Sequence, residues 1–285
     1  MSNPIHSTSA KSVLPMLAMR GLATGLCAGC VVGLLRLSHD RAAARVALWL
    51  EEWREVWWTV PIWFGVLVAL AVILRRIVRE EPLISGSGIP QTELALAGRL
   101  SFTWWRVLLA KFLGSWLALF GGLALGREGP SIQMGGAVGA GFHALWRPAA
   151  PHALTGSPYV VAGAVAGLAA AFGAPAAGGL FAFEEMKSRR DTSLIVAACA
   201  SAIGAHLMIR IVFGMGRILP FAGFEAPPLS SFWIVALEGA VFGVLGVGYN
   251  KTLLWLHDRE AGQTLIPDRW RALPPLLLAG CLALF

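Results

Sequence analysis

Gly86-Ser87-Gly88-Ile89-Pro90 interrupts an otherwise apolar chain, and a second break of the same kind follows about 40 residues later. This second break is Gly126-Arg127-Glu128-Gly129-Pro130. Proline suits the first position of a helix, because its missing N–H would be unpaired there and its φ angle is preset. Glycine permits the unusual backbone angles that precede it. Each break therefore predicts a new helix that starts inside an apolar region.

A third break, Ala171-Phe172-Gly173-Ala174-Pro175, has the same order of small residues before a proline. The free N–H groups and the dipole of a helix N-terminus attract an anion without any fixed cation. Half-helices that aim such N-termini at an anion are a recurring feature of transporters. For each break taken alone, a purely structural kink is the alternative interpretation.

The composition excludes a soluble globular protein. The chain has 285 residues, of which 56% are hydrophobic and 14% are charged, and its mean hydropathy is +0.67. Soluble domains have about 25% charged residues, and a disordered chain would be far less apolar. A spanning helix needs about 20 residues, so the length allows roughly seven to ten membrane segments. The 33 glycines let helices approach closely in lipid, which favours a polytopic all-α membrane protein.

The apolar segments and the charges between them predict the membrane topology. Residues 1–12 read as a short polar cytoplasmic tail, and residues 13–285 as one transmembrane domain. The Trp-rich amphipathic segment 41–58 is expected to lie along an interface, where Trp is favoured. Basic clusters at 75–79 and 187–190 follow apolar runs, and the positive-inside rule places them in the cytoplasm. We expect a multi-pass protein of the inner membrane with a cytoplasmic N-terminus.

Other classes of function find little support in the sequence. The net charge of +7 comes from basic residues at the ends of apolar stretches, so we expect no nucleic-acid partner. Cys27 and Cys30 have CxxC spacing, but no second pair accompanies them, so we interpret the thiols as packing groups and expect no metal or cofactor. A membrane-embedded hydrolase is disfavoured, because no Ser/His/Asp or metal-ligand spacing is present. The protein is not expected to be an enzyme.

Glu128 carries the strongest functional signal of any single residue. An ionisable group at membrane depth costs roughly 2.5–3.5 kcal/mol or more and typically marks an ion or proton pathway. The deprotonated carboxylate can occupy the place of an anion at a helix N-terminus, and the protonated group loses that attraction. An ion pair with Arg127 is the alternative, although adjacent residues do not face each other on a helix. Glu184 and Glu185 also follow an apolar run. A functional role and a solvated helix end that pairs with the basic residues 187–190 explain these two glutamates equally well.

The ordered pair of pentapeptides at this separation resembles the CLC family of chloride channels and proton/chloride antiporters. The segment 162–186 extends the resemblance. It implies broken and tilted helices in two halves of opposite topology. It also implies a homodimer in which each subunit has its own pore, with chloride and protons as the transported ions. By this resemblance, Ser87 with Gly88 and Ile89 binds chloride, and Glu128 is the gating glutamate that takes protons from outside. The resemblance makes Glu185, with Glu184 beside it, the internal proton-transfer group, and the selectivity motifs are completed by Gly86, Pro90, Gly126, Arg127, Gly129 and Pro130.

One departure from the family pattern concerns the second half. The chain matches the first inverted repeat and the start of the second, and no Gly-x-Phe-x-Pro motif or pore tyrosine follows. Gln91 also stands where an acidic residue is common. We therefore expect chloride transport of the voltage-gated chloride channel family, as a proton/chloride antiporter, from a chain that is truncated at its C-terminus. The alternative is an incomplete half-subunit that does not transport by itself and binds or regulates a membrane partner.

Overall fold

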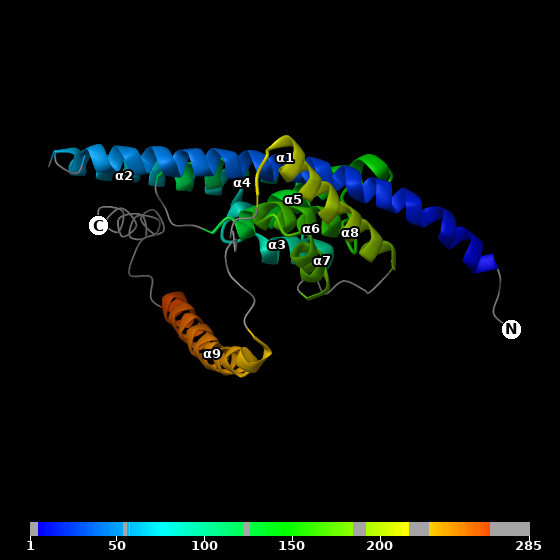
Figure 1. The fold of residues 1–285 in the computed structure, drawn as a ribbon. Coiled ribbons are helices and arrows are strands. Elements are labelled where there is room, and N and C mark those ends of the chain that lie inside the picture. The colour runs from blue at the N-terminus through cyan, green and yellow to red at the C-terminus, as the bar shows by residue number, and fades with distance from the viewer. Residues whose placement is uncertain are drawn as a thin grey trace. The chain divides into compact units, whose positions relative to one another are not determined.

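The computed structural model describes residues 5–53, 56, 58–121, 126–184, 192–216 and 228–262. All regular elements in these ranges are helices, which confirms the predicted all-α class (Figure 1). Two compact units are present: residues 1–218 with 273–285, and residues 219–272. In chain order the helices are α1 (Ile5–Trp53), α2 (Thr59–Glu80), η1 (Pro82–Ile84), α3 (Ile89–Leu96), α4 (Trp104–Phe120), α5 (Glu128–Trp146), α6 (Pro158–Phe172), α7 (Pro175–Glu184), α8 (Thr192–Leu207), the π-helical η2 (Met208–Val212), η3 (Leu229–Ser231) and α9 (Phe232–Gly262).

The described residues contain four membrane-spanning candidates. In the described ranges, four helices are long and apolar enough to cross a bilayer: Val13–Trp49, Thr59–Glu80, Thr192–Val212 and Phe232–Trp255. Other apolar helices are short, such as α6 with 15 residues. At 1.5 Å per residue, α6 extends about 22 Å, which is less than the roughly 30 Å of a hydrocarbon core. The Gly/Pro breaks therefore divide the apolar sequence into half-length helices.

Helix α1 is longer than the sequence suggested. It begins at Ile5, inside the segment that composition predicted as a polar tail, and it runs without interruption to Trp53. The segment 41–58, which was predicted to lie along an interface, is therefore part of α1 as far as Trp53. The reason is local, because no glycine or proline occurs between residues 34 and 53 and Ala42-Ala43-Ala44 favours helix.

A row of glycines joins α1 to α8. Gly21, Gly25, Gly29 and Gly33 recur every four residues and so share one face of α1. A Cβ atom on Gly21 would lie 2.5 Å from the Ala197 carbonyl oxygen, and one on Gly25 would overlap the Ser201 backbone. Such small-residue seams let helix backbones approach closely where lipid provides no hydrophobic drive between helices.

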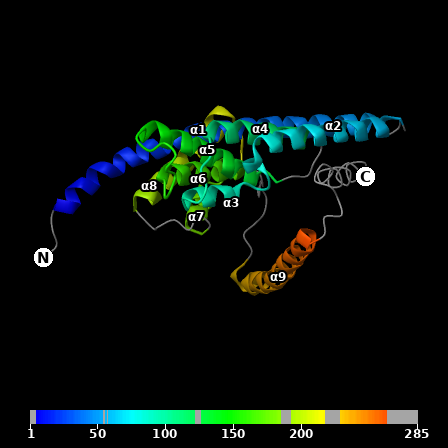
Figure 2. The ribbon, with the colours of Figure 1, turned by 180° about the vertical axis from the view of Figure 1, so that it is seen from behind.

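The centre of the first unit is the pair α5 and α6, which both views place alongside the long α1 (Figures 1 and 2). A Cβ atom on Gly135 would overlap the Gly163 carbonyl, and one on Gly163 would overlap the Gly135 carbonyl. The two backbones therefore touch without intervening side chains. Helix α6 is almost fully buried, and Ser201 of α8 donates a hydrogen bond of 2.7 Å to its Ala162 carbonyl.

Arg20, a charged residue within the apolar part of α1, is held by this core. Its guanidinium donates a 2.9 Å hydrogen bond to the Tyr159 hydroxyl and lies 5.1 Å from the centre of the Trp146 ring. Behind it, His143 Nδ1 lies 2.8 Å from the Ser157 hydroxyl, and the His143 side chain is buried. These contacts satisfy polar groups between α1, α5 and α6.

Replacing Gly25 with valine is expected to destabilise the first unit by about 3 kcal/mol or more, because backbone atoms of α8 occupy the required space and no rotamer change relieves the overlap. The matched control is Gly65→Val in α2, where nothing lies within 4 Å of the added Cβ. Thermal unfolding in detergent, followed by fluorescence-detected size exclusion, measures both. Equal melting temperatures for the two variants would contradict the close α1–α8 contact.

Candidate functional site

The break at residues 86–90 forms a loop that only glycine permits. Gly86 has φ +72° and Gly88 has φ +92°, both in the left-handed region that other residues rarely adopt. Gly88 is also the N-cap of α3, and a Cβ atom there would overlap the Gln133 side chain of α5. Pro90 lies in the first turn of α3, as its sequence position predicted. The first N–H of the helix, from Ile89, lies 3.4 Å from the Ser87 hydroxyl oxygen.

The second break meets the first directly. Helix α5 begins at Glu128, and a Cβ atom on Gly129 would lie 2.5 Å from the Ser87 carbonyl oxygen and 2.9 Å from the Ser87 Cα. Only a glycine at position 129 allows this approach. The Glu128 carboxylate folds back over Gly126, where an added Cβ would overlap its Oε2 atom. The two motifs that the sequence singled out therefore form one site.

Ser87 and Glu128 line a single hollow of about 510 Å³. Its walls come from the end of α2, the loop before α3, the middle of α4 and the start of α5. The lining residues are Leu74, Val78, Ile84, Ser85, Gly86, Ser87, Lys111, Gly114, Ser115, Ala118, Gly126, Glu128, Gly129 and Pro130. The N-terminal turn of α5 begins at this hollow, so the partial positive charge of its helix dipole is available to an anion bound there.

Lys111 is a site residue that was not predicted. It is 4% exposed, and its Nζ donates hydrogen bonds to the carbonyl oxygens of Ile84 (2.8 Å) and Gly86 (2.7 Å). No carboxylate of the described ranges lies within ion-pair distance of this ammonium. The hollow therefore contains a lysine side chain, which the reasoning from the helix N-termini alone did not include. Its hydrogen bonds to the loop show that it shapes the site as well as charging it.

Two glutamines complete the support of the loop. Gln91 Nε2 donates to the Ser85 carbonyl at 2.9 Å, and Gln133 Nε2 donates to the Leu83 carbonyl at 2.7 Å. Gln133 is 3% exposed and comes from α5, so it ties the second motif to the residues before the first. At position 91, where the family commonly has an acidic residue, this chain thus uses an amide donor that a carboxylate could not supply.

Arg127 and Glu128 have different surroundings although they are adjacent. The Arg127 guanidinium lies 3.5 Å from Asp40 Oδ1 of α1, and it does not pair with the adjacent Glu128. Among the described residues, Glu128 has no ion-pair or hydrogen-bond partner for its side chain. The alternative in which Arg127 neutralises Glu128 is therefore wrong, and the carboxylate is left to face the hollow.

The third break does not line this hollow. The third break forms the turn between two helices: Gly173, with φ +66°, caps the end of α6, and Pro175 starts α7. A new helix therefore starts at the third break, as its sequence predicted. The backbone of Glu184 ends α7, and nothing is described of its side chain, whereas Glu185 lies outside the described residues. Within the described ranges, no group of three or more His, Cys, Asp or Glu side chains could hold a metal ion.

Comparison with known proteins identifies the family. Residues 64–285 match the family described as voltage gated chloride channel. The H(+)/Cl(-) exchange transporter ClcA of Vibrio cholerae is 37% identical over 241 residues, which cover 82% of this chain and 51% of the relative. The protein of the same name from Yersinia pestis is 35% identical over 248 residues, 81% of this chain and 49% of the relative.

A solved structure agrees with these sequence matches. The crystal structure of a slow cyanobacterial Cl⁻/H⁺ antiporter superposes with a TM-score of 0.78 at 29% identity, covering 93% of this chain and 64% of that one. The chain spans about half the length of the curated relatives it matches. Family match, sequence identity and fold point the same way: the chain belongs to the CLC family of voltage-gated chloride channels and transporters.

Proposed function

We propose that the protein exchanges chloride for protons across a membrane and that the hollow lined by Ser87, Lys111 and Glu128 is its anion site. The observation that carries the proposal is the contact of the two motifs. Gly129 lies against the Ser87 backbone, and Ser87 and Glu128 line the same space. Relatives named as H(+)/Cl(-) exchange transporters support the choice of ions.

The proposed mechanism is alternating occupancy of one place by chloride and by the Glu128 carboxylate. Chloride would accept hydrogen bonds from the Ser87 hydroxyl and from the backbone N–H groups of Gly88 and Ile89. Deprotonated Glu128 competes for the same positive potential, since it too is an anion at a helix N-terminus. A proton from outside neutralises the carboxylate, which then leaves the place to chloride. Proton movement and anion movement are thereby coupled without a cofactor.

The proton route inward is assigned by resemblance. Glu185, outside the described residues, is proposed as the internal proton-transfer group, with Glu184 as its neighbour. This assignment distinguishes an antiporter from a channel. The two carboxylates, Glu128 and Glu185, would then be the outer and inner ends of the proton path.

The subunit arrangement and the location are also proposals. Ile203 and Leu207 of α8 and Ile211 of η2 form an outward apolar row, exposed by 53%, 40% and 75%. A homodimer that buries this row, with a separate pore in each subunit, agrees with the family resemblance. The arginines at the end of α2 support an inner-membrane orientation with a cytoplasmic N-terminus.

The test is ion flux from liposomes that contain the purified full-length protein. We expect chloride to leave while protons move against it, and Ser87→Ala to weaken chloride binding by about tenfold to a hundredfold, the equivalent of one hydrogen bond to a charged group. Calorimetric chloride titration measures the affinity, and Ser101→Ala, in an exposed loop that does not line the hollow, is the control. Absence of proton movement with chloride flux intact would favour a channel. Absence of any chloride binding would refute the anion site.

A further inference from the structure

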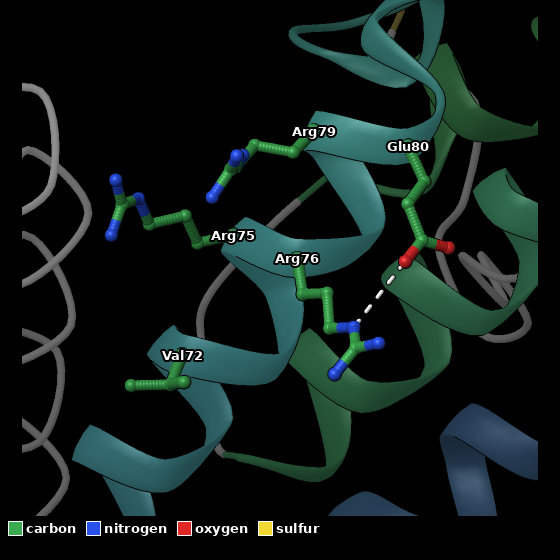
Figure 3. Close-up of a pocket in the computed structure, with 5 residues that line it drawn as sticks. All are labelled: Val72, Arg75, Arg76, Arg79 and Glu80. Atoms are coloured by element: carbon green, nitrogen blue, oxygen red, sulfur yellow. Dashed lines mark hydrogen bonds and ion pairs between the residues drawn. The ribbon is translucent and has the colours of Figure 1, made fainter.

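Three arginines close α2, and they do not have the same surroundings. Arg76 Nε donates to Glu80 Oε1 at 3.3 Å, an exposed ion pair one turn apart. Figure 3 shows this pair, and it shows Arg75 and Arg79 directed to another side of the helix, together with Val72. Within the described ranges, neither Arg75 nor Arg79 has a carboxylate partner. The guanidinium groups of Arg75 and Arg79 are therefore available to bind an anionic ligand.

On the same side of α2, the residues before Arg75 form an exposed apolar stripe that consists of Val68 and Val72. Val68, Val72, Arg75 and Arg79 are spaced four, three and four residues apart, which places them on one face. Val68 is 38% exposed and Val72 is 62% exposed, whereas Trp63 and Leu67 on the opposite face are 4% and 0% exposed. One exposed helical face therefore changes from aliphatic to doubly cationic at the end of a span.

We propose that Arg75 and Arg79 bind the phosphate of an anionic phospholipid headgroup, with Val68 and Val72 against its acyl chain. Arginine presents planar N–H donors that match phosphate oxygens. Basic residues at the end of a membrane span are attracted to anionic lipid by about 1 kcal/mol each. The aliphatic stripe below the guanidinium groups favours a lipid over free phosphate, because inorganic phosphate leaves that stripe uncovered. This site is separate from the anion hollow, which neither arginine lines.

The test compares lipid binding to the full-length protein and two sets of variants in native mass spectrometry. The lipids are phosphatidylglycerol and phosphatidylcholine with identical acyl chains. Arg75→Gln with Arg79→Gln is expected to weaken phosphatidylglycerol binding about 30-fold and to leave phosphatidylcholine binding unchanged. Arg76→Gln is the matched control, since it removes one positive charge from the same turn of helix but takes it from the ion pair with Glu80. Arg75→Lys with Arg79→Lys should retain most of the binding, which shows that the charge and not the fold is lost in the glutamine variant.

The outcomes separate lipid from other occupants. An excess of inorganic phosphate should leave bound phosphatidylglycerol in place. Displacement by phosphate would show a free-anion site and overturn the lipid assignment. Equal losses in Arg76→Gln and in the double glutamine variant would show a diffuse charge effect and overturn the two-arginine site. Unchanged phosphatidylglycerol binding in the double glutamine variant would do the same.

Discussion

Replacing Glu128 with alanine is expected to reduce coupled proton movement to the level of empty liposomes while chloride flux continues. The carboxylate has no ion-pair or hydrogen-bond partner among the described residues, and it lines the same hollow as Ser87. Its removal therefore leaves the loop and its hydrogen bonds intact, and it takes away the one carboxylate among the described residues that line the hollow. Simultaneous recording of chloride efflux and of pH in the external solution measures the coupling ratio directly.

Two variants sharpen this test of Glu128. Glu128→Gln mimics the protonated state, so we expect it also to uncouple protons while chloride still passes. Glu80→Gln removes an exposed carboxylate that does not line the hollow, and it should keep the wild-type coupling ratio. Retained proton coupling in Glu128→Ala would exclude this residue from the proton path.

Replacing Lys111 with methionine is expected to destabilise the protein by about 3 kcal/mol or more and to weaken chloride binding at least tenfold. The change removes two hydrogen bonds from a charged donor, each contributing about 1.5–3 kcal/mol, and leaves two loop carbonyls without their partner. These carbonyls belong to Ile84 and Gly86, in the loop that leads directly into Ser87. Loss of the ammonium also lowers the positive potential in the hollow.

The measurement for Lys111 combines thermal unfolding in detergent with its dependence on chloride concentration. Arg106→Met on the same helix is the matched control, because Arg106 is exposed and lies 5.5 Å from the centre of the Trp105 ring. We expect that control to cost no more than about 1 kcal/mol, the usual size of an exposed cation–π contact, and to leave the chloride response unchanged. A Lys111→Met protein that is destabilised but retains the wild-type chloride shift would show that the lysine supports only the fold.

The helix breaks could be predicted because they depend on local chemistry. The glycines followed by a proline predicted the starts of α3, α5 and α7. In the structure these helices begin at Ile89, Glu128 and Pro175. The family resemblance assigned Ser87 and Glu128 to one ion pathway, but the contact of Gly129 with the Ser87 backbone was not predicted. The length of α1 was underestimated because composition marks where polarity changes, and a polar segment without glycine or proline remains helical.

The supports of the site could not be predicted, because they join residues far apart in the sequence. Lys111 reaches a carbonyl 25 positions earlier, and Gln133 reaches one 50 positions earlier. Lys111 stands in an apolar stretch beside other basic residues, so nothing local distinguished it from a charge at a helix end. The ion pair of Arg127 with Asp40 of α1 could not be predicted either, because these residues are also far apart in the sequence. The role of Glu185 stays a prediction, since that residue lies outside the described ranges.

The direct backbone contact of α5 and α6 restricts how the proposed cycle can move. Gly135 meets Gly163 without side chains between them, and Gly167 meets Ser131 one turn nearer to Glu128. Interfaces of this kind cannot slide by small steps, because every displacement drives backbone atoms into each other. The start of α5 is thereby held as rigidly as the core behind it. In the proposed cycle the moving part is the Glu128 side chain, and the helix that carries it stays still.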